Sequence, residues 1–194
     1  MKKKVNKCDF GYLNYQCKKE IIMTILLFVI SLGILFLGIC INGTKNNLLT
    51  IVAVLGLLPA SKELIITVMF LRAKKYACSE SLHEEILATG DYEKSKIIRY
   101  DLYMTAYQKN FPIYAMTCKA GELIGFSDVP DFDYEEATKH IMLLLSQNGF
   151  KNITVKIFDK KEKFLERLKA MSLSENENTG KDLEILHLME NISL

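Results

Sequence analysis

The sequence predicts a two-helix transmembrane hairpin followed by a small cytosolic α/β (α+β) domain, and three observations support this fold class. Two apolar segments, residues 21–41 and 48–71, each match the roughly 20 residues that a helix needs to cross a bilayer. Lysine and arginine gather at the outer ends of these segments. After residue 72 the pattern changes to short helical and strand-like periods, which is typical of one small domain.

The charge distribution predicts the orientation of the hairpin. Residues 1–72 contain nine Lys/Arg and three Asp/Glu, a net charge of +6, whereas residues 73–194 contain sixteen and twenty, a net charge of −4. The connecting loop at 42–47 has a single lysine. Because Lys and Arg are enriched on the cytoplasmic side, we expect a multi-pass protein of the cell membrane with both termini in the cytoplasm. The first 20 residues are then a basic cytosolic segment, and the long apolar core argues against a cleaved signal peptide.

Polar residues interrupt the second span. Lys62 lies about nine residues before Leu71, or roughly 14 Å into the membrane at 1.5 Å per residue. We expect Lys62, Glu63 and Pro59, together with Ser31 of the first span, to form an intramembrane polar site that faces protein rather than lipid. Three interpretations stay open. The site fixes packing with the first helix or with another copy, or it binds an ion, a proton or a lipid head group. In the third, the helix breaks at Pro59 and restarts at Ser61, which leaves residues 64–71 partly interfacial.

Small residues indicate how the two spans approach each other. Ala53, Gly56 and Ala60 make one small face on the second span, and the spacing of Gly56 and Ala60 allows close helix contact. On the first span, Ser31, Gly33 and Gly38 offer matching small positions. The short loop predicts that the spans are antiparallel neighbours.

The cytosolic α/β domain is expected over residues 72–171, in the order α-β-β-β-α-β-α. Ser81 and Glu84 have capping-box spacing for a helix that ends at Gly90. Alternation from residue 97 predicts a strand with Ile98, Tyr100, Leu102, Met104 and Ala106 on one face, and residues 111–119 and 122–127 complete an antiparallel three-strand meander with a tight turn at Gly121. A helix over 133–149, a strand over 153–158 and a helix over 159–171 follow. Residues 172–194 are predicted to be a polar linker and an amphipathic helix over 182–192 that docks or floats.

Titratable residues give few signs of chemistry. The five cysteines contain no CxxC pair, so we expect neither disulfides nor a metal site, and no cofactor motif is present. His83, His140 and His187 lie on separate predicted elements. Five acidic residues crowd the start of the 133–149 helix: Asp128, Asp131, Asp133, Glu135 and Glu136. They either compensate the helix dipole or form a docking site for a basic partner or a loosely bound cation.

The order of elements resembles the core of the restriction-endonuclease-like nucleases, which place an acid on one core strand and an acid-x-Lys motif on the next. Asp101 stands at the place of the first acid, and Thr117-Cys118-Lys119 stands at the place of the second motif, with Thr117 replacing a carboxylate. A hairpin paired through Tyr107 and Phe111 would put Asp101 opposite Thr117 and Arg99 opposite Lys119. The resemblance implies a degenerate nuclease that uses Asp101, Lys119 and a further carboxylate such as Glu85. The net charge of −4 argues against a nucleic-acid partner.

The whole pattern also resembles uncharacterised two-span membrane proteins of low-GC bacteria, through its lysine-rich start, the segment 57–62 and the small following domain. The preferred interpretation is a non-enzymatic, membrane-anchored cytosolic interaction domain. Its partners are the lipid bilayer and a protein partner or a second copy bound through the hairpin. The alternatives are the membrane-tethered degenerate nuclease-like domain and a small transport or channel accessory that uses Lys62 and Glu63.

Overall fold

The computed structural model describes residues 5–90, 97–106, 109–173 and 180–194 of the chain. By internal contacts the chain divides into two compact units, one formed by Leu13–Lys75 and the other by residues 1–12 together with Tyr76–Leu194. Three sequence predictions fall wholly or partly outside the described residues. They are the lysines at positions 2–4, the position of Tyr107, and most of the linker over 172–180.

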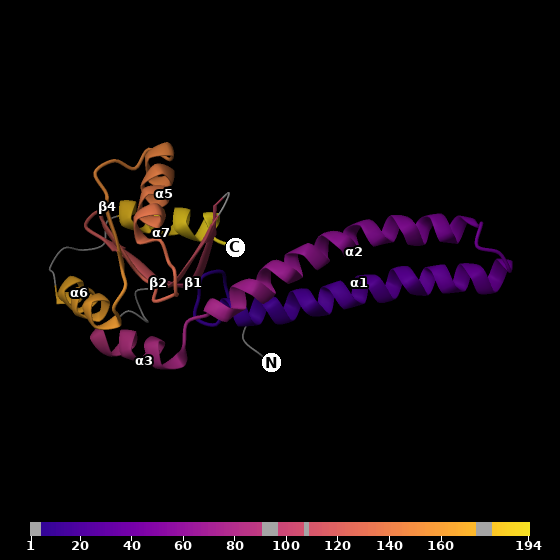
Figure 1. The fold of residues 1–194 in the computed structure, drawn as a ribbon, viewed down its shortest axis with the longest axis horizontal. Coiled ribbons are helices and arrows are strands. Elements are labelled where there is room, and N and C mark those ends of the chain that lie inside the picture. The colour runs from indigo at the N-terminus through magenta and orange to yellow at the C-terminus, as the bar shows by residue number, and fades with distance from the viewer. Residues whose placement is uncertain (1–4, 91–96, 107–108, 174–179) are drawn as a thin grey trace. The chain divides into compact units, whose positions relative to one another are not determined.

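The first unit is a helical hairpin (Figure 1) made of α1 (Tyr12–Asn42) and α2 (Leu48–Ala73). Helix α1 begins nine residues before the predicted span, because the polar residues that precede Ile21 continue the same helix. In the connecting loop Gly43 has a φ of 63°, and Asn47 caps α2 by accepting a hydrogen bond from the Thr50 amide at 2.9 Å. The Asn47 side chain also donates to the Gly38 carbonyl at 3.0 Å, which ties the loop to the end of α1.

The interface between α1 and α2 consists of small and polar side chains. Ala53, Ala60 and Thr67 are buried on α2 at seven-residue intervals. The Thr67 hydroxyl lies 2.8 Å from that of Thr24 on α1, in a buried hydrogen bond. A Cβ atom at Gly56 would lie 2.8 Å from the Ser31 hydroxyl, so the two backbones approach closely there. Of the small positions named on α1, Ser31 and Gly38 are buried and Gly33 is exposed.

The large apolar side chains of the hairpin point outward. In the most apolar 18 residues of each helix only 17% of residues are buried. Both helices are long and apolar enough to cross a membrane. The exposed large side chains include Ile22, Ile25, Leu26, Val29, Ile30, Phe36 and Leu37 on α1 and Ile51, Leu55, Leu58, Leu64, Ile65 and Leu71 on α2.

The second unit is built on a mixed sheet of four strands in the order β1-β2-β3-β4. Strands β1 (Ile98–Thr105), β2 (Asn110–Lys119) and β3 (Glu122–Phe126) are antiparallel, and β4 (Thr154–Phe158) lies parallel to β3. The three antiparallel strands of the predicted meander are therefore only part of the sheet, which is four-stranded and mixed because β4 joins it. The added strand is parallel because helix α5 (Tyr134–Gln147) returns the chain from the end of β3 to the start of β4.

Helices cover both faces of this sheet (Figure 1). On one face α3 (Glu80–Thr89) and α6 (Lys161–Leu173) bury Leu82, Ile86, Phe164 and Leu168. On the other face α5 and α7 (Gly180–Ile192) bury Ile141, Leu145, Ile185, Leu186 and Met189. The C-terminal helix is thus docked. Between the hairpin and α3 the chain makes the short 3-10 helix η1 (Lys74–Tyr76).

The side-chain alternation predicted for β1 is wrong beyond Tyr100. Ile98 and Tyr100 pack in the cluster under α3 and α6, whereas Leu102 and Met104 pack in the cluster under α5 and α7. Between them Asp101 has a φ of 56°. A residue in the left-handed region breaks the period of two, so the side chains beyond it change faces.

Both ends of the second unit cover the edge of β1. The Tyr100 amide donates to the Cys8 carbonyl at 2.8 Å, and the Tyr103 amide donates to the Ser193 hydroxyl at 2.8 Å. The Lys7 ammonium donates to the Ser193 carbonyl at 2.7 Å and joins the two ends. Cys8 is fully buried in the core. The N-terminal segment, which we expected only as a basic cytosolic head, is therefore an integral part of the sheet edge.

Candidate binding pocket and the predicted polar sites

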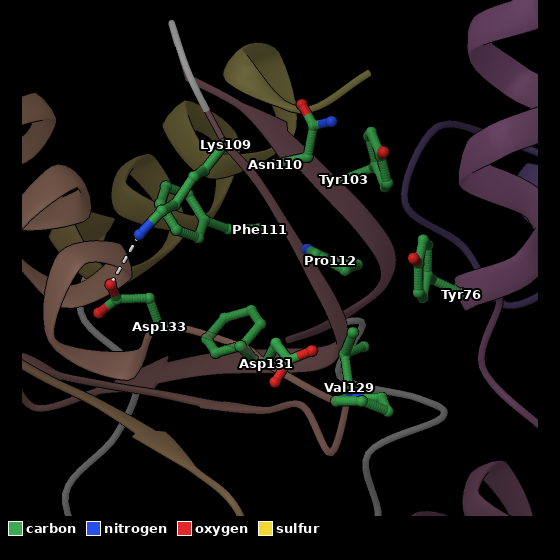
Figure 2. A pocket seen from close by; sticks show the side chains of 11 residues that line it. Tyr76, Tyr103, Lys109, Asn110, Phe111, Pro112, Val129, Asp131 and Asp133 are labelled. Atoms are coloured by element: carbon green, nitrogen blue, oxygen red, sulfur yellow. Dashed lines mark hydrogen bonds and ion pairs between the residues drawn. The ribbon is translucent and has the colours of Figure 1, made fainter.

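The described part of the α/β unit has a pocket of about 310 Å³ beside the start of β2. Figure 2 shows its lining from three parts of the chain. The β1–β2 hairpin contributes Tyr103, Lys109, Asn110, Phe111 and Pro112, the loop before α5 contributes Val129, Pro130, Asp131, Phe132 and Asp133, and η1 contributes Tyr76. The loop before α5 is positioned by Phe132, whose ring meets that of Phe111 edge-on at 5.9 Å.

Two tyrosines form the aromatic side of the pocket. The rings of Tyr76 and Tyr103 stack with their centres 6.1 Å apart and an angle of 26° between their planes. The backbone of Tyr103 is held by the C-terminal residues, because its amide donates to Ser193 and its carbonyl accepts from the Leu194 amide at 3.0 Å. An aromatic pair held in this way offers a flat face for an apolar stem or a cation.

Lys109 lies on the opposite side, where acidic groups neutralise it (Figure 2). Its ammonium is 2.9 Å from the Asp133 carboxylate and 2.6 Å from that of Glu136. These hydrogen bonds raise the pKa of Lys109. Asp133 also caps α5 by accepting from the Glu136 amide at 2.9 Å, which with Lys109 holds the pKa of Asp133 below its ordinary value. Asp133 and Glu136 therefore act as helix cap and as counter-charge for Lys109.

Asp131 is the acidic group that remains on the pocket rim. It is exposed, and among the described residues its carboxylate has no hydrogen bond or ion pair. Its φ is 61°, a conformation that Asp tolerates better than most residues. Lys109, Asp131 and Asp133 together give the lining a formal charge of −1. The pocket therefore has one aromatic side and an acidic rim.

Asp101 and Lys119, the candidates carried by the nuclease resemblance, each bind backbone groups of neighbouring segments. The buried Asp101 carboxylate accepts from the Cys78 amide at 2.7 Å. The Lys119 ammonium donates to the Met171 carbonyl at 2.6 Å, at the end of α6. Glu85, the third residue of that hypothesis, pairs with Lys161 at 2.8 Å. Each contact ties a strand or helix to its neighbour.

The predicted pairing of this hairpin is wrong by three residues. Thr117 lies opposite Ile98 rather than Asp101, and Arg99 lies opposite Met116 rather than Lys119. The reason is the turn, since Thr105 already pairs with Asn110 and the Ala106 amide donates to the Lys109 carbonyl at 2.9 Å. Within the described residues no group of three or more His, Cys, Asp or Glu is placed to hold a metal ion.

The thiols of the α/β unit are buried and protonated. Burial raises the pKa of Cys8 and of Cys78 to about 12, and it also raises that of Cys118. Since the thiolate is the reactive form of cysteine, these residues serve packing. Cys118 contacts Asp182, whose buried carboxylate accepts from the Ala120 and Gly121 amides at 3.1 and 3.0 Å. No sequence signal marked Asp182, because its partners lie about 60 residues away.

The predicted intramembrane site is only partly assembled in the hairpin. Ser31 and Ala60 are buried, Glu63 is half-buried, and Lys62 and Pro59 are exposed on the outer surface of α2. Lys62 therefore does not face α1, so of the two packing partners expected for it only another copy of the chain is left. The buried polar groups of the interface are instead Glu20, Thr24, Ser31 and Thr67. On α1, Glu20, Thr24 and Ser31 follow one another at four- and seven-residue spacing, which places them on one face of the helix.

Comparison with protein-family models, with curated proteins and with solved structures gives no match to this chain. The resemblances stated for the sequence thus rest on the order of elements and on the hairpin alone.

Proposed function

We propose that this chain is a membrane-anchored interaction protein, in which the hairpin spans the bilayer and holds the α/β unit at the cytoplasmic surface. The observation that carries the proposal is the inverted packing of the hairpin. Small and polar side chains lie between α1 and α2, and Ile, Leu, Val and Phe cover the outside. In water the large apolar side chains of a helix pair would pack inward. In lipid, helices associate through small residues and interhelical hydrogen bonds, as here.

The distribution of charge supports the orientation. Arg72 lies in the last turn of α2 and Lys74 and Lys75 follow that helix. Lys18 and Lys19 lie before the apolar part of α1, and the loop between the helices has a single lysine. The positive-inside rule then places the α/β unit and both termini in the cytoplasm.

The pocket beside Tyr76 supports binding of a basic segment of a partner protein. A lysine or arginine side chain could lay its stem on the Tyr76–Tyr103 pair and direct its charge to Asp131. Lys109 repels the bound cation only weakly, because Asp133 and Glu136 neutralise its charge. Asp101 accepts a hydrogen bond from the Cys78 amide and Lys119 donates one to the Met171 carbonyl. These backbone contacts favour a binding role over the nuclease alternative.

Two experiments test the proposal. Alkaline carbonate should leave the full chain in the membrane pellet, and release of the intact chain into the supernatant would contradict the anchor. A photo-crosslinking amino acid in place of the exposed Asn110 should capture one defined protein in cells, and Asp131→Lys or Tyr76→Ala should abolish that adduct. Glu166→Lys, on the exposed side of α6, is the matched charge reversal and should leave it intact. An adduct equally strong in all four chains would refute the pocket as the binding surface.

A further inference from the structure

Five basic residues of the hairpin unit lie at the end where α1 begins and α2 finishes. Lys18 and Lys19 belong to α1, Arg72 belongs to α2, and Lys74 and Lys75 belong to η1. All five are exposed. We call this group the basic collar.

The register of the hairpin brings the two halves of the collar to one level. The Thr24–Thr67 hydrogen bond places these two residues opposite each other. Lys19 precedes Thr24 by five residues and Arg72 follows Thr67 by five. Because the helices are antiparallel, both lie about 7.5 Å from the threonine pair in the same direction along the hairpin, at 1.5 Å per residue. Cations separated by 53 positions in the chain therefore share one level.

The collar is poorly neutralised by the protein. Among the described residues, Lys18, Arg72, Lys74 and Lys75 make no ion pair, and Lys19 lies 3.9 Å from Glu20. Glu20 itself is buried and accepts a hydrogen bond from Gln16 at 2.6 Å, so it is directed inward rather than over the surface cations. The collar cations are thus exposed, and the carboxylate beside Lys19 is turned inward.

A large apolar surface begins directly next to the collar. Ile22 is 65% exposed, and Val68, Met69 and Leu71 are exposed on α2. A band of free cations bordering an apolar surface matches the boundary between phospholipid head groups and acyl chains, where phosphate is the abundant anion.

We propose that the basic collar binds anionic phospholipids and keeps them enriched around the hairpin. This proposal rests on the membrane anchor proposed above and adds a lipid preference to it. Lysine and arginine each contribute by charge at such a surface, and Arg72 can also bind a phosphate with two parallel hydrogen bonds. The preference should therefore weaken as salt increases.

The test uses the full chain reconstituted in phosphatidylcholine vesicles that contain a trace of spin-labelled lipid. Electron paramagnetic resonance then measures how much of the label is motionally restricted at the protein surface, for labelled phosphatidylglycerol and for labelled phosphatidylcholine in parallel. The expected result is a several-fold preference for phosphatidylglycerol, which falls close to one when all five collar residues are changed to Gln. A variant with Arg in place of the four lysines and Lys in place of Arg72 keeps the charge and should preserve the preference.

A matched control changes five exposed lysines of the α/β unit to Gln: Lys151, Lys156, Lys160, Lys163 and Lys169. This variant loses the same charge and should keep the lipid preference. Equal restriction of the two labelled lipids by the wild-type chain, or equal loss of preference in both Gln variants, would overturn the proposal. Vesicle flotation separates this failure from that of the anchor, since a chain that floats without lipid preference refutes the collar alone, and one that does not float refutes the anchor.

Discussion

Asp182 is the residue whose replacement tests most directly how the C-terminal helix is held. Asp182 lies in the first turn of α7 and is 1% exposed. Its carboxylate accepts hydrogen bonds from the amides of Ala120 and Gly121. These two residues form the turn between β2 and β3, with φ values of 52° and 75°. Such a turn directs its amides outward, and no strand partner satisfies them.

The expected cost of Asp182→Ala follows from these contacts. A hydrogen bond to a charged group contributes about 1.5–3 kcal/mol, and the two amides are left without their acceptor when the carboxylate is removed. We expect the docking of α7 to weaken by about 3–5 kcal/mol, a large part of the roughly 5–15 kcal/mol that stabilises a typical domain. Asp182→Asn keeps one acceptor oxygen and should lose about half as much.

Hydrogen exchange by mass spectrometry on the full chain in detergent measures this change. Peptides that cover α7 and the β2–β3 turn should exchange at least about 100-fold faster in Asp182→Ala, since 1.4 kcal/mol corresponds to a factor of ten. Peptides from α3, on the other face of the sheet, should change less. Glu184→Gln, an exposed change on the same helix, is the control and should alter exchange very little. An acceleration below about fivefold in α7 would show that its apolar face alone holds the helix, and would refute this reasoning.

Three further predictions concern the strand, the helix cap and the hairpin. Asp101→Ala should destabilise the α/β unit by about 2–4 kcal/mol in chemical denaturation, because the buried acceptor of the Cys78 amide is lost. Asp101→Asn should cost far less, since Asn also tolerates a positive φ. Equal losses in the two variants would contradict this prediction. The pKa of Asp133 is lowered in the folded protein, so its contribution to the free energy of unfolding is complete above the unfolded pKa near 3.9 and is lost as pH falls through the lower folded pKa. Thermal midpoints between about pH 2 and 6 should therefore fall less steeply in Asp133→Asn than in wild type. Parallel curves would argue against the cap. Gly56→Ala should loosen the hairpin, because its Cβ would meet the Ser31 hydroxyl at 2.8 Å, and adding Ser31→Gly should restore the packing. The yield of cross-linking between cysteines placed on α1 and α2 measures both effects. A lower yield that Ser31→Gly does not raise again would place the constraint elsewhere.

Local features of the sequence predicted the helices and their ends well, because each signal lies within a few residues of its effect. Asp133, the first residue of the predicted 133–149 helix, caps α5 through the Glu136 amide, and Gly149 follows the helix with a φ of 83°. Gly121 forms the tight turn between β2 and β3. At α3 the predicted cap was Ser81, but the residue that accepts from the Leu82 amide is Ser79. Cap signals that lie two residues apart are not distinguished by spacing alone.

The candidate site was less predictable, because its parts are distant in the chain. Tyr103 lies within a predicted strand and Tyr76 lies outside every predicted element, yet their rings stack beside the pocket. The acidic rim was visible as a cluster, but which carboxylates were already engaged by Lys109 depended on the fold of the β1–β2 hairpin.

What the sequence alone determined is the division of the chain into an apolar hairpin and an α/β unit, together with the helix starts and turns, since periodicity and capping act over neighbouring residues. Tertiary structure decided the rest. A single left-handed residue, Asp101, moved half of β1 to the other face, and the edge of that strand is closed by Cys8 and Ser193, from opposite ends of the chain. Such outcomes depend on hydrogen bonds and packing between residues that are close only after folding, and no local spacing encodes them.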